Sequence, residues 1–314
     1  MKGNDSLVRA RGLTKRFGDF TAVDAVDFDI APGESFGFLG PNGAGKTSTM
    51  KMITTVSPIT DGDLTVFDLD PVEDGPVIRS RLGVVPQEDN LDLELSVAEN
   101  LYVYGRYHDL DKATIRLRID ELLDFSQLSE KRDSPVDDLS GGMKRRLTIA
   151  RSLINQPDLV ILDEPTTGLD PQARHVLWDR LRQLKSRGAT LIITTHYMDE
   201  AQQLCDRLVV MDGGRIVAED SPAGLIRTHS TREVLELFFD PVDHAAASTR
   251  LENGGIGGIQ RVETLSERIL LYTEDADATL TVLESNDFHP RGTLTRRSTL
   301  EDVFLRLTGR HLTD

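Results

Sequence analysis

The stretch SFGFLGPNGAGKTS, residues 35–48, decides the fold. Its first five residues form an apolar run typical of a buried strand, and the glycine-rich run after it fits G-x-x-x-x-G-K-[ST] and leads into a helical pattern. In this context the pattern predicts a phosphate-binding loop, because the glycines let backbone N–H groups wrap around phosphate oxygens. Lys46 is expected to reach the terminal phosphate oxygens, and the Thr47 hydroxyl is expected to ligate Mg²⁺. The residues assigned to nucleotide binding here are Gly40, Pro41, Asn42, Gly43, Ala44, Gly45, Lys46, Thr47 and Ser48.

Two acidic residues end a second apolar run, residues 159–162. If that run is a strand, Asp163 and Glu164 emerge at the carboxyl edge of a sheet, where ligands bind in α/β proteins. Asp163 can hold Mg²⁺ through its water shell, and Glu164 can polarise a water for in-line attack on a γ-phosphate. The alternative for Glu164 is a loop acid without a role. The phosphate loop upstream favours the catalytic interpretation.

Two further polar residues follow apolar runs of the same kind. His196 comes after residues 191–195, so it would emerge at the same sheet edge as the acids. A lone histidine at a strand end is usually structural, but its placement beside the acids favours a catalytic contact with the γ-phosphate. Gln87 comes after residues 83–86 and offers a neutral amide to Mg²⁺ or to water without adding charge.

A second glycine-rich helix start lies in the run LSGGM, residues 139–143. Ser140, Gly141 and Gly142 present a hydroxyl, backbone N–H groups and a helix dipole to an anion. Since the first loop already holds a nucleotide, the simplest source of that anion is ATP bound to a second copy of the chain. The alternative is an ordinary helix cap. The basic run KRR at residues 144–146 is expected to be a solvated helix face rather than a nucleic-acid patch, because the chain is acidic.

The composition argues against several classes of partner and predicts where the protein works. The chain has 314 residues, with 52 acidic against 36 basic side chains and a formal net charge of −16, which argues against broad binding to nucleic acid or to an anionic membrane face. Apolar runs such as residues 208–211 fall far short of the roughly 20 residues that span a bilayer. The N-terminus has no apolar signal-peptide core, and the single cysteine, Cys205, allows no intrachain disulfide. Both observations predict a cytoplasmic protein.

The order of patterns predicts an α/β fold with two domains. Helical and strand patterns alternate along the first part, which indicates a parallel sheet with helices on its faces. A block opened by the capping box Ser96-x-x-Glu99 is expected as a helical insert, so that a helical subdomain spans about residues 96–155 of a domain covering residues 1–229. Residues 230–314 follow the order β-α-β-β-α-β, which predicts a small ferredoxin-like α+β domain. We expect a regulatory or assembly module there, with a packing appendage as the alternative.

These motifs, in this order, resemble the nucleotide-binding subunits of ABC transporters over residues 6 to about 228. The phosphate loop is similar to that family's Walker A motif, and the strand that ends in Asp163 and Glu164 is similar to its Walker B motif. The run LSGGM resembles its signature motif. Gln87 resembles the glutamine of its Q-loop, and His196 resembles its switch histidine. The resemblance implies that Asp170, in the D-loop, contributes to the nucleotide site. It also implies that Phe17, where tyrosine is commoner, stacks on adenine. A plain core aromatic is the alternative for Phe17.

Three longer stretches narrow the resemblance, namely VVPQEDNLDLELSVAENLYVYGRYH, LSGGMKRRLTIARSLINQPDLVILDEPTTGLDP and LEDVFLRLTGR. They are similar to the ATPase subunits of ABC-2-type exporters, the branch that includes daunorubicin-resistance and nodulation lipo-oligosaccharide exporters. Met143 stands where glutamine is commoner, but that branch often has methionine too. The resemblance implies an ATPase that powers efflux of amphipathic, drug-like compounds, with a lipid or lipo-oligosaccharide as the alternative cargo. A soluble ABC ATPase acting on a ribosome or nucleic acid is the alternative from another class.

The same resemblance implies the partners. Two copies are expected to meet head to tail, with each ATP held by Lys46 of one copy and by residues 140–142 of the other. A separate ABC-2-type transmembrane permease would contact the surface around residues 87–107, and no nucleic-acid partner is expected. The protein would then work at the cytoplasmic face of the cell membrane, held there through the permease.

Overall fold

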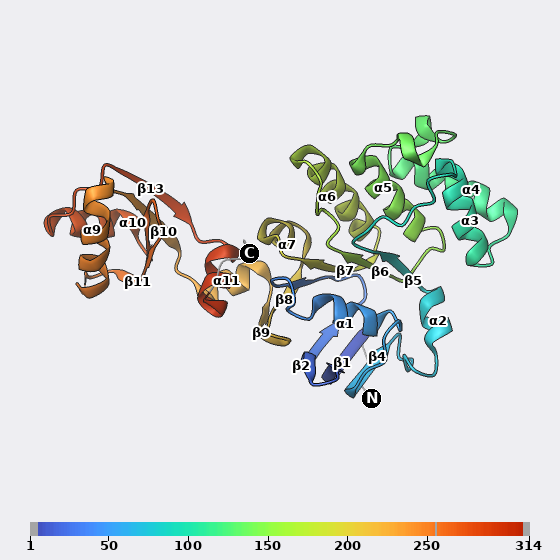
Figure 1. The fold of residues 1–314 in the computed structure, drawn as a ribbon, viewed down its shortest axis with the longest axis horizontal. Coiled ribbons are helices and arrows are strands. Elements are labelled where there is room, and N and C mark those ends of the chain that lie inside the picture. The colour runs from blue at the N-terminus through green and yellow to red at the C-terminus, as the bar shows by residue number, and fades with distance from the viewer. Residues whose placement is uncertain (1–5, 255, 310–314) are drawn as a thin grey trace. The chain divides into compact units, whose positions relative to one another are not determined.

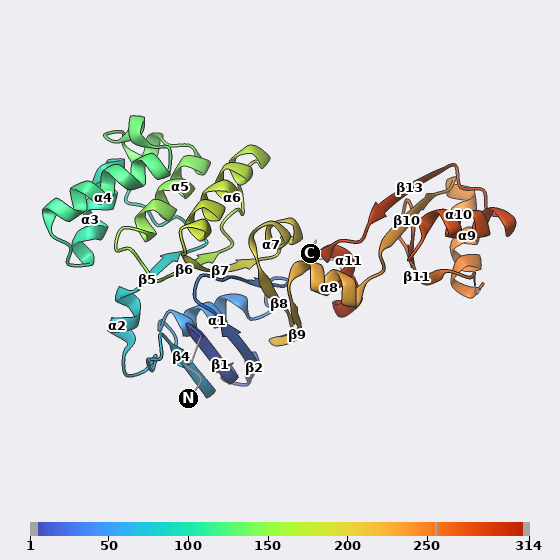
Figure 2. The same cartoon turned by 180° about the vertical axis from the view of Figure 1, so that it is seen from behind.

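The computed structural model of the chain describes residues 6–254 and 256–309. Within those ranges no helix is both long and apolar enough to cross a membrane. The chain divides into two compact units, and the division falls between Ser221 and Pro222. Figures 1 and 2 show the fold from opposite sides.

The first unit is built on a six-stranded sheet in the order β5-β6-β7-β3-β8-β9. The first five strands in that order are parallel, and β9 runs antiparallel to β8. The central strands β3, β6 and β7 are buried along nearly their whole length, as expected for parallel strands that are covered on both faces. The strands span β3 Ser35–Leu39, β5 Leu82–Val85, β6 Leu159–Asp163, β7 Thr190–Thr195, β8 Arg207–Asp212 and β9 Arg215–Asp220.

The main hydrophobic core lies between this sheet and a three-stranded antiparallel sheet in the order β2-β1-β4. Phe28 of β2 meets Phe38 of β3 in this core, with ring centroids 5.2 Å apart. Helix α1 adds Met52 and Ile53 to the same core. The core therefore fixes β3 and α1, and with them the loop that joins them. These elements span β1 Val8–Phe17, β2 Phe20–Ile30, β4 Asp61–Val66 and α1 Lys46–Ile53.

Helices α5, α6 and α7 lie on the opposite side of the six-stranded sheet from α1 (Figure 1). The predicted helical insert consists of α3 and α4, which pack against each other and against α5. The capping box opens α3 as expected, because Ser96 N–H donates to Glu99 Oε2 at 2.8 Å and Glu99 N–H donates to Ser96 Oγ at 3.3 Å. The helices span α2 Gly75–Ser80, α3 Val97–Tyr107, α4 Lys112–Phe125, α5 Gly141–Ser152, α6 Pro171–Ser186 and α7 Met198–Leu204.

The second unit has a four-stranded antiparallel sheet in the order β11-β12-β10-β13. Its elements follow the predicted chain order β-α-β-β-α-β, so the small α+β domain is confirmed. Alternate residues of β10, Leu235 and Leu237, pack in one core with Leu251 and Leu283 from the two helices. The elements span β10 Glu233–Phe238, α9 Pro241–Asn253, β11 Ile259–Thr264, β12 Ile269–Thr273, α10 Ala276–Ser285 and β13 Gly292–Arg297.

Two further helices complete the second unit, α8 (Pro222–His229) and α11 (Leu300–Thr308). They pack against each other, and Arg306 of α11 donates a hydrogen bond to His229 O at 2.9 Å. Because of this packing, the division between the units precedes α8, whereas the sequence places a boundary at residue 229.

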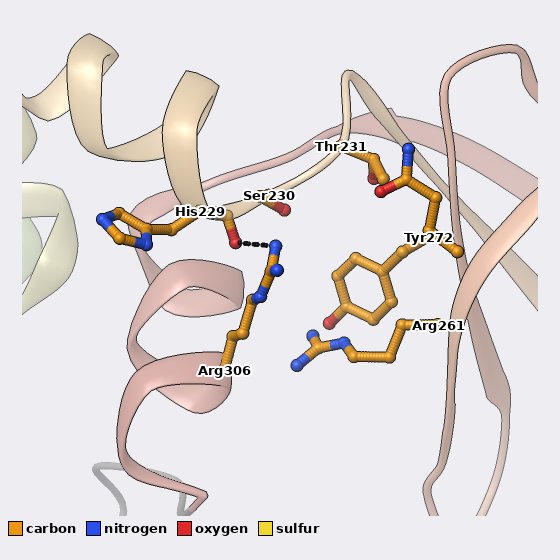
Figure 3. Close-up of a pocket in the computed structure, with 7 residues that line it drawn as sticks. His229, Ser230, Thr231, Arg261, Tyr272 and Arg306 are labelled. Atoms are coloured by element: carbon orange, nitrogen blue, oxygen red, sulfur yellow. Dashed lines mark hydrogen bonds between the residues drawn. The ribbon is translucent and has the colours of Figure 1, made fainter.

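A pocket of about 140 Å³ lies in the second unit, with α11 on one side and the sheet on the other (Figure 3). The Arg261 guanidinium lies 3.8 Å from the Tyr272 ring centroid and 3.3 Å from Glu263 Oε2. The Tyr272 hydroxyl also donates to Glu263 Oε2, at 3.0 Å, and Arg306 is engaged with the His229 carbonyl. The side chains of Arg261, Tyr272 and Arg306 are therefore held by groups of the same unit.

Candidate active site

Strands of the six-stranded sheet end together at one edge. Parallel pairing aligns Leu39 of β3 with Thr195 of β7, and Asp163 of β6 with Thr194 of β7. Strand β5 ends beside β6 in the same way. The residues that follow these four strands therefore emerge at one edge, where ligand sites of α/β sheets are found.

Lys46 begins α1 and is buried, with 5% of its side chain exposed. Its ammonium donates to Gly40 O at 2.7 Å and to Pro41 O at 3.0 Å, so it closes over carbonyls of its own loop. Nζ also lies 3.7 Å from Glu164 Oε1. Burial lowers the pKa of Lys46, and the nearby Glu164 opposes that effect. A buried cation beside a phosphate-binding loop is suited to neutralise phosphate oxygens.

The loop before Lys46 fits a bound phosphate. Gly45 has φ +102° and a Cβ there would lie 2.5 Å from Ala22 O, so only glycine is accommodated. A Cβ on Gly43 would meet nothing within 4 Å, which shows that the loop is open on that side. No side chain in the described part of the chain caps the N-terminus of α1. Its first backbone N–H groups are therefore available to an anion.

The carboxylate of Glu164 is the centre of the site. Its Oε1 lies 3.2 Å from His196 Nδ1 and 3.7 Å from Lys46 Nζ. Its Oε2 accepts hydrogen bonds from Gln87 Nε2 at 3.4 Å and from Thr167 Oγ1 at 3.2 Å. The structure thus brings together four residues that the sequence placed at separate strand ends or in the loop, namely Lys46, Gln87, Glu164 and His196.

The surroundings of Glu164 favour its charged form. The contact with His196 has the largest effect and lowers the pKa of Glu164, burial opposes it, and Lys46 and Thr167 lower the pKa further. Nδ1 of His196 has no well-aligned hydrogen-bond partner among the described residues, although Glu164 Oε1 lies within 3.2 Å of it. The site therefore holds a carboxylate, rather than a carboxylic acid, at neutral pH.

Glu164 is also held in a strained backbone conformation. Its φ is +46°, in the left-handed region that residues other than glycine rarely adopt. Its N–H donates to Thr194 Oγ1 at 3.0 Å, and the same hydroxyl donates to Asp163 Oδ1. Backbone strain of this kind persists where the surroundings over-determine it, and it concentrates at functional sites. Neither Thr194 nor Thr167 was predicted, because a threonine in a strand or loop carries no distinguishing pattern.

The oxygen ligands expected for Mg²⁺ are Thr47, exposed in the first turn of α1, and Asp163, half-buried at the end of β6. Gln87 is exposed and adds an amide oxygen. No group of three or more histidine, cysteine, aspartate or glutamate side chains within the described ranges forms a metal site of its own. Mg²⁺ is usually bound by one or two side chains together with substrate phosphates, so this donor set fits Mg²⁺ that arrives with a nucleotide.

The predicted second anion site lies at the exposed start of α5. Ser140 Oγ accepts a hydrogen bond from Met143 N–H at 3.3 Å, so the residue does cap the helix. Gly141 is exposed, and a Cβ there would meet nothing within 4 Å. In the part of the chain that the structure describes, no hydrogen bond or ion pair joins residues 140–142 to Glu164. Within a single copy, the segment faces solvent.

Phe17 and Asp170 lie outside the Glu164 cluster. Phe17 is 54% exposed, so the alternative of a core aromatic is wrong, and Lys15 Nζ lies over its ring at 4.9 Å from the centroid. Asp170 is exposed and caps α6 by accepting from Ala173 N–H at 2.9 Å. The roles of both residues at the nucleotide stay predictions.

Arg145 corrects the prediction of a solvated basic face. Its side chain is 4% exposed, and its guanidinium is surrounded by backbone carbonyls of two loops, residues 86–87 and residues 163–165. The sequence does hold a signal for this burial, because Arg145 shares the helical spacing of the buried Thr148 and Ser152. The high charge of the run KRR obscured that signal.

Glu200 of α7 is a second buried charge that was not predicted. It has no exposed surface, and neither carboxyl oxygen has a well-aligned hydrogen-bond partner among the described residues. Burial raises the pKa of Glu200, while the neighbouring Thr195, Thr166 and Trp178 act in the opposite direction.

Two family models match the chain. The model described as ABC transporter matches residues 23–167, and the model described as Nodulation factor export protein NodI, C-terminal domain, matches residues 248–309. The chain is 45% identical to the Nod factor export ATP-binding protein I of Ralstonia nicotianae, over 99% of this chain and 97% of that protein. It is also 45% identical to the protein of the same name from Rhizobium meliloti, over 96% of this chain and 88% of that protein.

Solved structures of ATP-binding cassettes match the first unit. One described as the ATP-binding subunit of an ABC transporter is 28% identical with a TM-score of 0.65, over 71% of this chain and 93% of that one. Another, a dimeric post-hydrolysis state of an ATP-binding cassette bound to ADP and Pi, is 25% identical with a TM-score of 0.62, over 68% of this chain and 98% of that one. These similarities place the Glu164 cluster within a fold that binds adenine nucleotides.

Proposed function

The chain belongs to the ATP-binding subunits of ABC transporters, in the family of the Nod factor export protein NodI, and from this premise we propose that it powers export of a lipo-oligosaccharide of the Nod factor type. As an ABC cassette it hydrolyses ATP for transport. The observation that carries the proposal is that relatives named for Nod factor export match both units, over 99% of the chain at 45% identity. This similarity supports the lipo-oligosaccharide alternative better than a drug-like cargo.

The phosphate loop and Lys46 would hold the phosphates of ATP. Residues 40–48 offer backbone N–H groups from a loop that is open at Gly43, and Lys46 offers a buried ammonium. Thr47, Asp163 and Gln87 would hold Mg²⁺, which neutralises charge on the transferring phosphoryl group. In this arrangement Lys46 exchanges its carbonyl partners for phosphate oxygens.

Glu164 would orient the attacking water and accept its proton. Its pKa is held low while His196 and Lys46 lie beside it, so the carboxylate is charged but engaged. When phosphate oxygens draw His196 and Lys46 toward the nucleotide, one carboxylate oxygen becomes free to accept a hydrogen bond from water. His196 would then contact the γ-phosphate. This order makes a competent base depend on bound nucleotide.

Each site would be completed by a second copy. The start of α5 faces solvent in one copy, and its hydroxyl and backbone N–H groups have the chemistry to bind phosphate. A head-to-tail dimer would place these groups of one copy on the ATP held by Lys46 of the other, with Asp170 and Phe17 contributing as predicted. A similar solved cassette is described as dimeric, which supports this assembly.

The membrane partner would be an ABC-2-type permease that docks beside the Gln87 loop. A largely apolar groove of about 340 Å³ lies there, and the exposed Val56 and Val84 are among the residues that line it. Tyr104 and His108 of the helical insert also line the groove. Two of the lining residues, Asn90 and Tyr104, belong to the surface around residues 87–107 that the sequence assigns to the permease. The protein would be held at the cytoplasmic face of the membrane through this contact.

The test combines the chain with its membrane subunit in sealed vesicles. The vesicles are inside-out, so that exported cargo collects in their lumen. We expect a lipo-chitooligosaccharide to stimulate ATP hydrolysis and to accumulate in the lumen, and we expect daunorubicin to do neither. Vesicles carrying the Glu164→Gln variant serve as the control without hydrolysis. Stimulation by daunorubicin alone would contradict the proposed cargo. Co-sedimentation with ribosomes, together with failure to bind the membrane subunit, would favour the soluble class instead.

A further inference from the structure

Arg145 lies in the second turn of α5 and is almost fully buried, with 4% of its side chain exposed. The helix begins at the segment proposed to bind the ATP of a second copy, residues 140–142. One turn later it carries this guanidinium toward the sheet edge where β5 and β6 end. A buried cation needs hydrogen-bond acceptors that satisfy its donors.

Its acceptors are main-chain carbonyls of two loops. Toward the end of β5, Nη1 donates to Pro86 O at 2.5 Å and to Gln87 O at 3.3 Å. Toward the end of β6, Nη2 donates to Asp163 O at 3.1 Å and Glu164 O at 3.2 Å, and Nε donates to Pro165 O at 2.8 Å. One side chain therefore bridges the backbones of both loops.

The bridged loops carry side chains that meet in the active site. Gln87 Nε2 donates to Glu164 Oε2 at 3.4 Å, so the separation of the two backbones sets this contact. Glu164 is also the residue with φ +46°. A strained residue keeps its conformation only when its neighbours over-determine it, and the bonds from Arg145 to three successive carbonyls around Glu164 do so.

We propose that Arg145 is a positioning residue for ATP hydrolysis. It holds the Glu164 turn and the Gln87 loop at a fixed separation. Through this bridge the position of the Glu164 carboxylate depends on α5, the helix that would meet the second copy. It depends equally on the Gln87 loop, which borders the permease groove. The inference rests on the proposed function, in which Glu164 orients the attacking water.

Arginine is suited to this bridge in a way that lysine is not. Its planar guanidinium carries five N–H donors in a rigid fork, whereas the lysine ammonium is a compact charge with three. Asp89 Oδ1 lies 3.3 Å from Nη1 and is the acidic partner of the pair. Arg145→Lys keeps the charge and an attraction to Asp89, but it cannot reach both loops. The substitution therefore separates geometry from charge.

The experiment measures kcat, KM for ATP, equilibrium ATP affinity and Tm of the full chain with Arg145→Lys. We expect kcat to fall about 10- to 100-fold, because small displacements of reacting groups have effects of that size. KM and ATP affinity should stay within about twofold, because the phosphate loop is untouched. Amide hydrogen exchange should speed up in residues 87–89 and 163–167 and remain unchanged in β3.

The matched control is Arg146→Lys, at the next position of the same helix. Arg146 donates to Ser126 O at 2.8 Å and, among the described residues, has no hydrogen bond to either loop. We expect kcat of this variant to stay within about twofold of wild type, and its exchange at residues 163–167 to be unchanged. Both variants thus lose a guanidinium, but only Arg145→Lys loses the hydrogen bonds that bridge the two loops.

A kcat for Arg145→Lys within about threefold of wild type overturns the inference. An equal loss of ATP affinity and Tm in both lysine variants also overturns it, because that pattern marks helix packing. If Arg145→Lys does not fold, Arg145→Gln is measured in its place, and failure of both to fold overturns it as well. Glu164→Gln is assayed alongside, so that full hydrolysis by that variant would reveal failure of the proposed function itself.

Discussion

His196 Nδ1 lies 3.2 Å from Glu164 Oε1, which pairs the residue after β7 with the residue after β6. Lys46 Nζ lies 3.7 Å from the same carboxylate oxygen. Both neighbours therefore engage Oε1 of Glu164. Both groups are also those expected to meet phosphate oxygens. We therefore expect nucleotide binding to release the carboxylate by competition for the same partners, which would guard against water activation in the absence of ATP.

Replacing Glu164 by Gln should stop hydrolysis and preserve ATP binding. Glutamine keeps the shape of the side chain but cannot accept a proton from water, and loss of such a base costs about 10²- to 10⁴-fold in rate. With saturating ATP and Mg²⁺ the variant should elute from a sizing column as a dimer, and without nucleotide as a monomer. The exposed Glu88→Gln is the control and should retain hydrolysis. A variant that stays monomeric even with its membrane subunit would contradict the head-to-tail arrangement.

Gly141→Ala should leave the fold of a single copy unchanged and impair the ATP site that two copies would form together. A Cβ at Gly141 meets nothing within 4 Å, and alanine is the better helix former by up to about 1 kcal/mol, so Tm should hold or rise. In the dimer, the added methyl would stand where a phosphate approaches α5, and hydrolysis should fall about 100-fold, the scale of a lost anion-hole contact. The control is Gly257→Ala, another exposed glycine with open space. Unchanged ATPase activity in Gly141→Ala would exclude a phosphate at this helix start.

The residues of the Glu164 cluster could be predicted because each one follows an apolar strand or lies in the phosphate loop. Once β6 and β7 pair in parallel, the residues after Asp163 and Thr195 are forced to one edge. Strand β4 could not be predicted from its own residues, which are polar at its start. It depends on the close approach of Gly62 to Gly12, where a Cβ would lie 2.2 Å from Gly12 O. Contacts of this kind exist only in the folded chain.

Arg145 escaped prediction for a different physical reason. Its acceptors are backbone carbonyls, and every residue has one, so no residue type marks them. Charge patterning favoured solvent exposure for the run KRR, and burial won because α5 turns that position toward the ends of β5 and β6. The early boundary before α8 has a similar origin, since only the packing of α8 on α11 assigns it to the second unit.

Phe17→Ala should weaken ATP binding, whereas Phe17→Tyr should not. The ring is 54% exposed, and stacking of a base on an aromatic face contributes about 1–3 kcal/mol, which corresponds to at least about a fivefold rise in the Kd for ATP. Phe20→Ala is the matched control, because Phe20 is 64% exposed and lies in the same β1–β2 hairpin. Equilibrium binding of a fluorescent ATP analogue provides the measurement. Equal effects of the two alanine variants would argue that Phe17 does not contact the base.

Glu200→Gln should stabilise the fold at neutral and alkaline pH but not at pH 4. Burial raises the pKa of Glu200 above its ordinary value of 4.5. As pH rises through 4.5 the unfolded chain ionises while the folded chain keeps its proton, so the free energy of unfolding falls until the raised pKa is reached. Glutamine escapes this loss. A poorly satisfied buried carboxylate costs about 1–3 kcal/mol of unfolding free energy, and each kcal/mol shifts Tm by about 2–4 °C. The Tm of Glu200→Gln at pH 8 should therefore exceed that of wild type by several degrees.

The control is Asp199→Asn, because Asp199 is exposed on the same helix. Thermal unfolding followed by circular dichroism gives the comparison. A Tm difference that is the same at pH 4 and pH 8 would show that Glu200 is not held protonated by the fold.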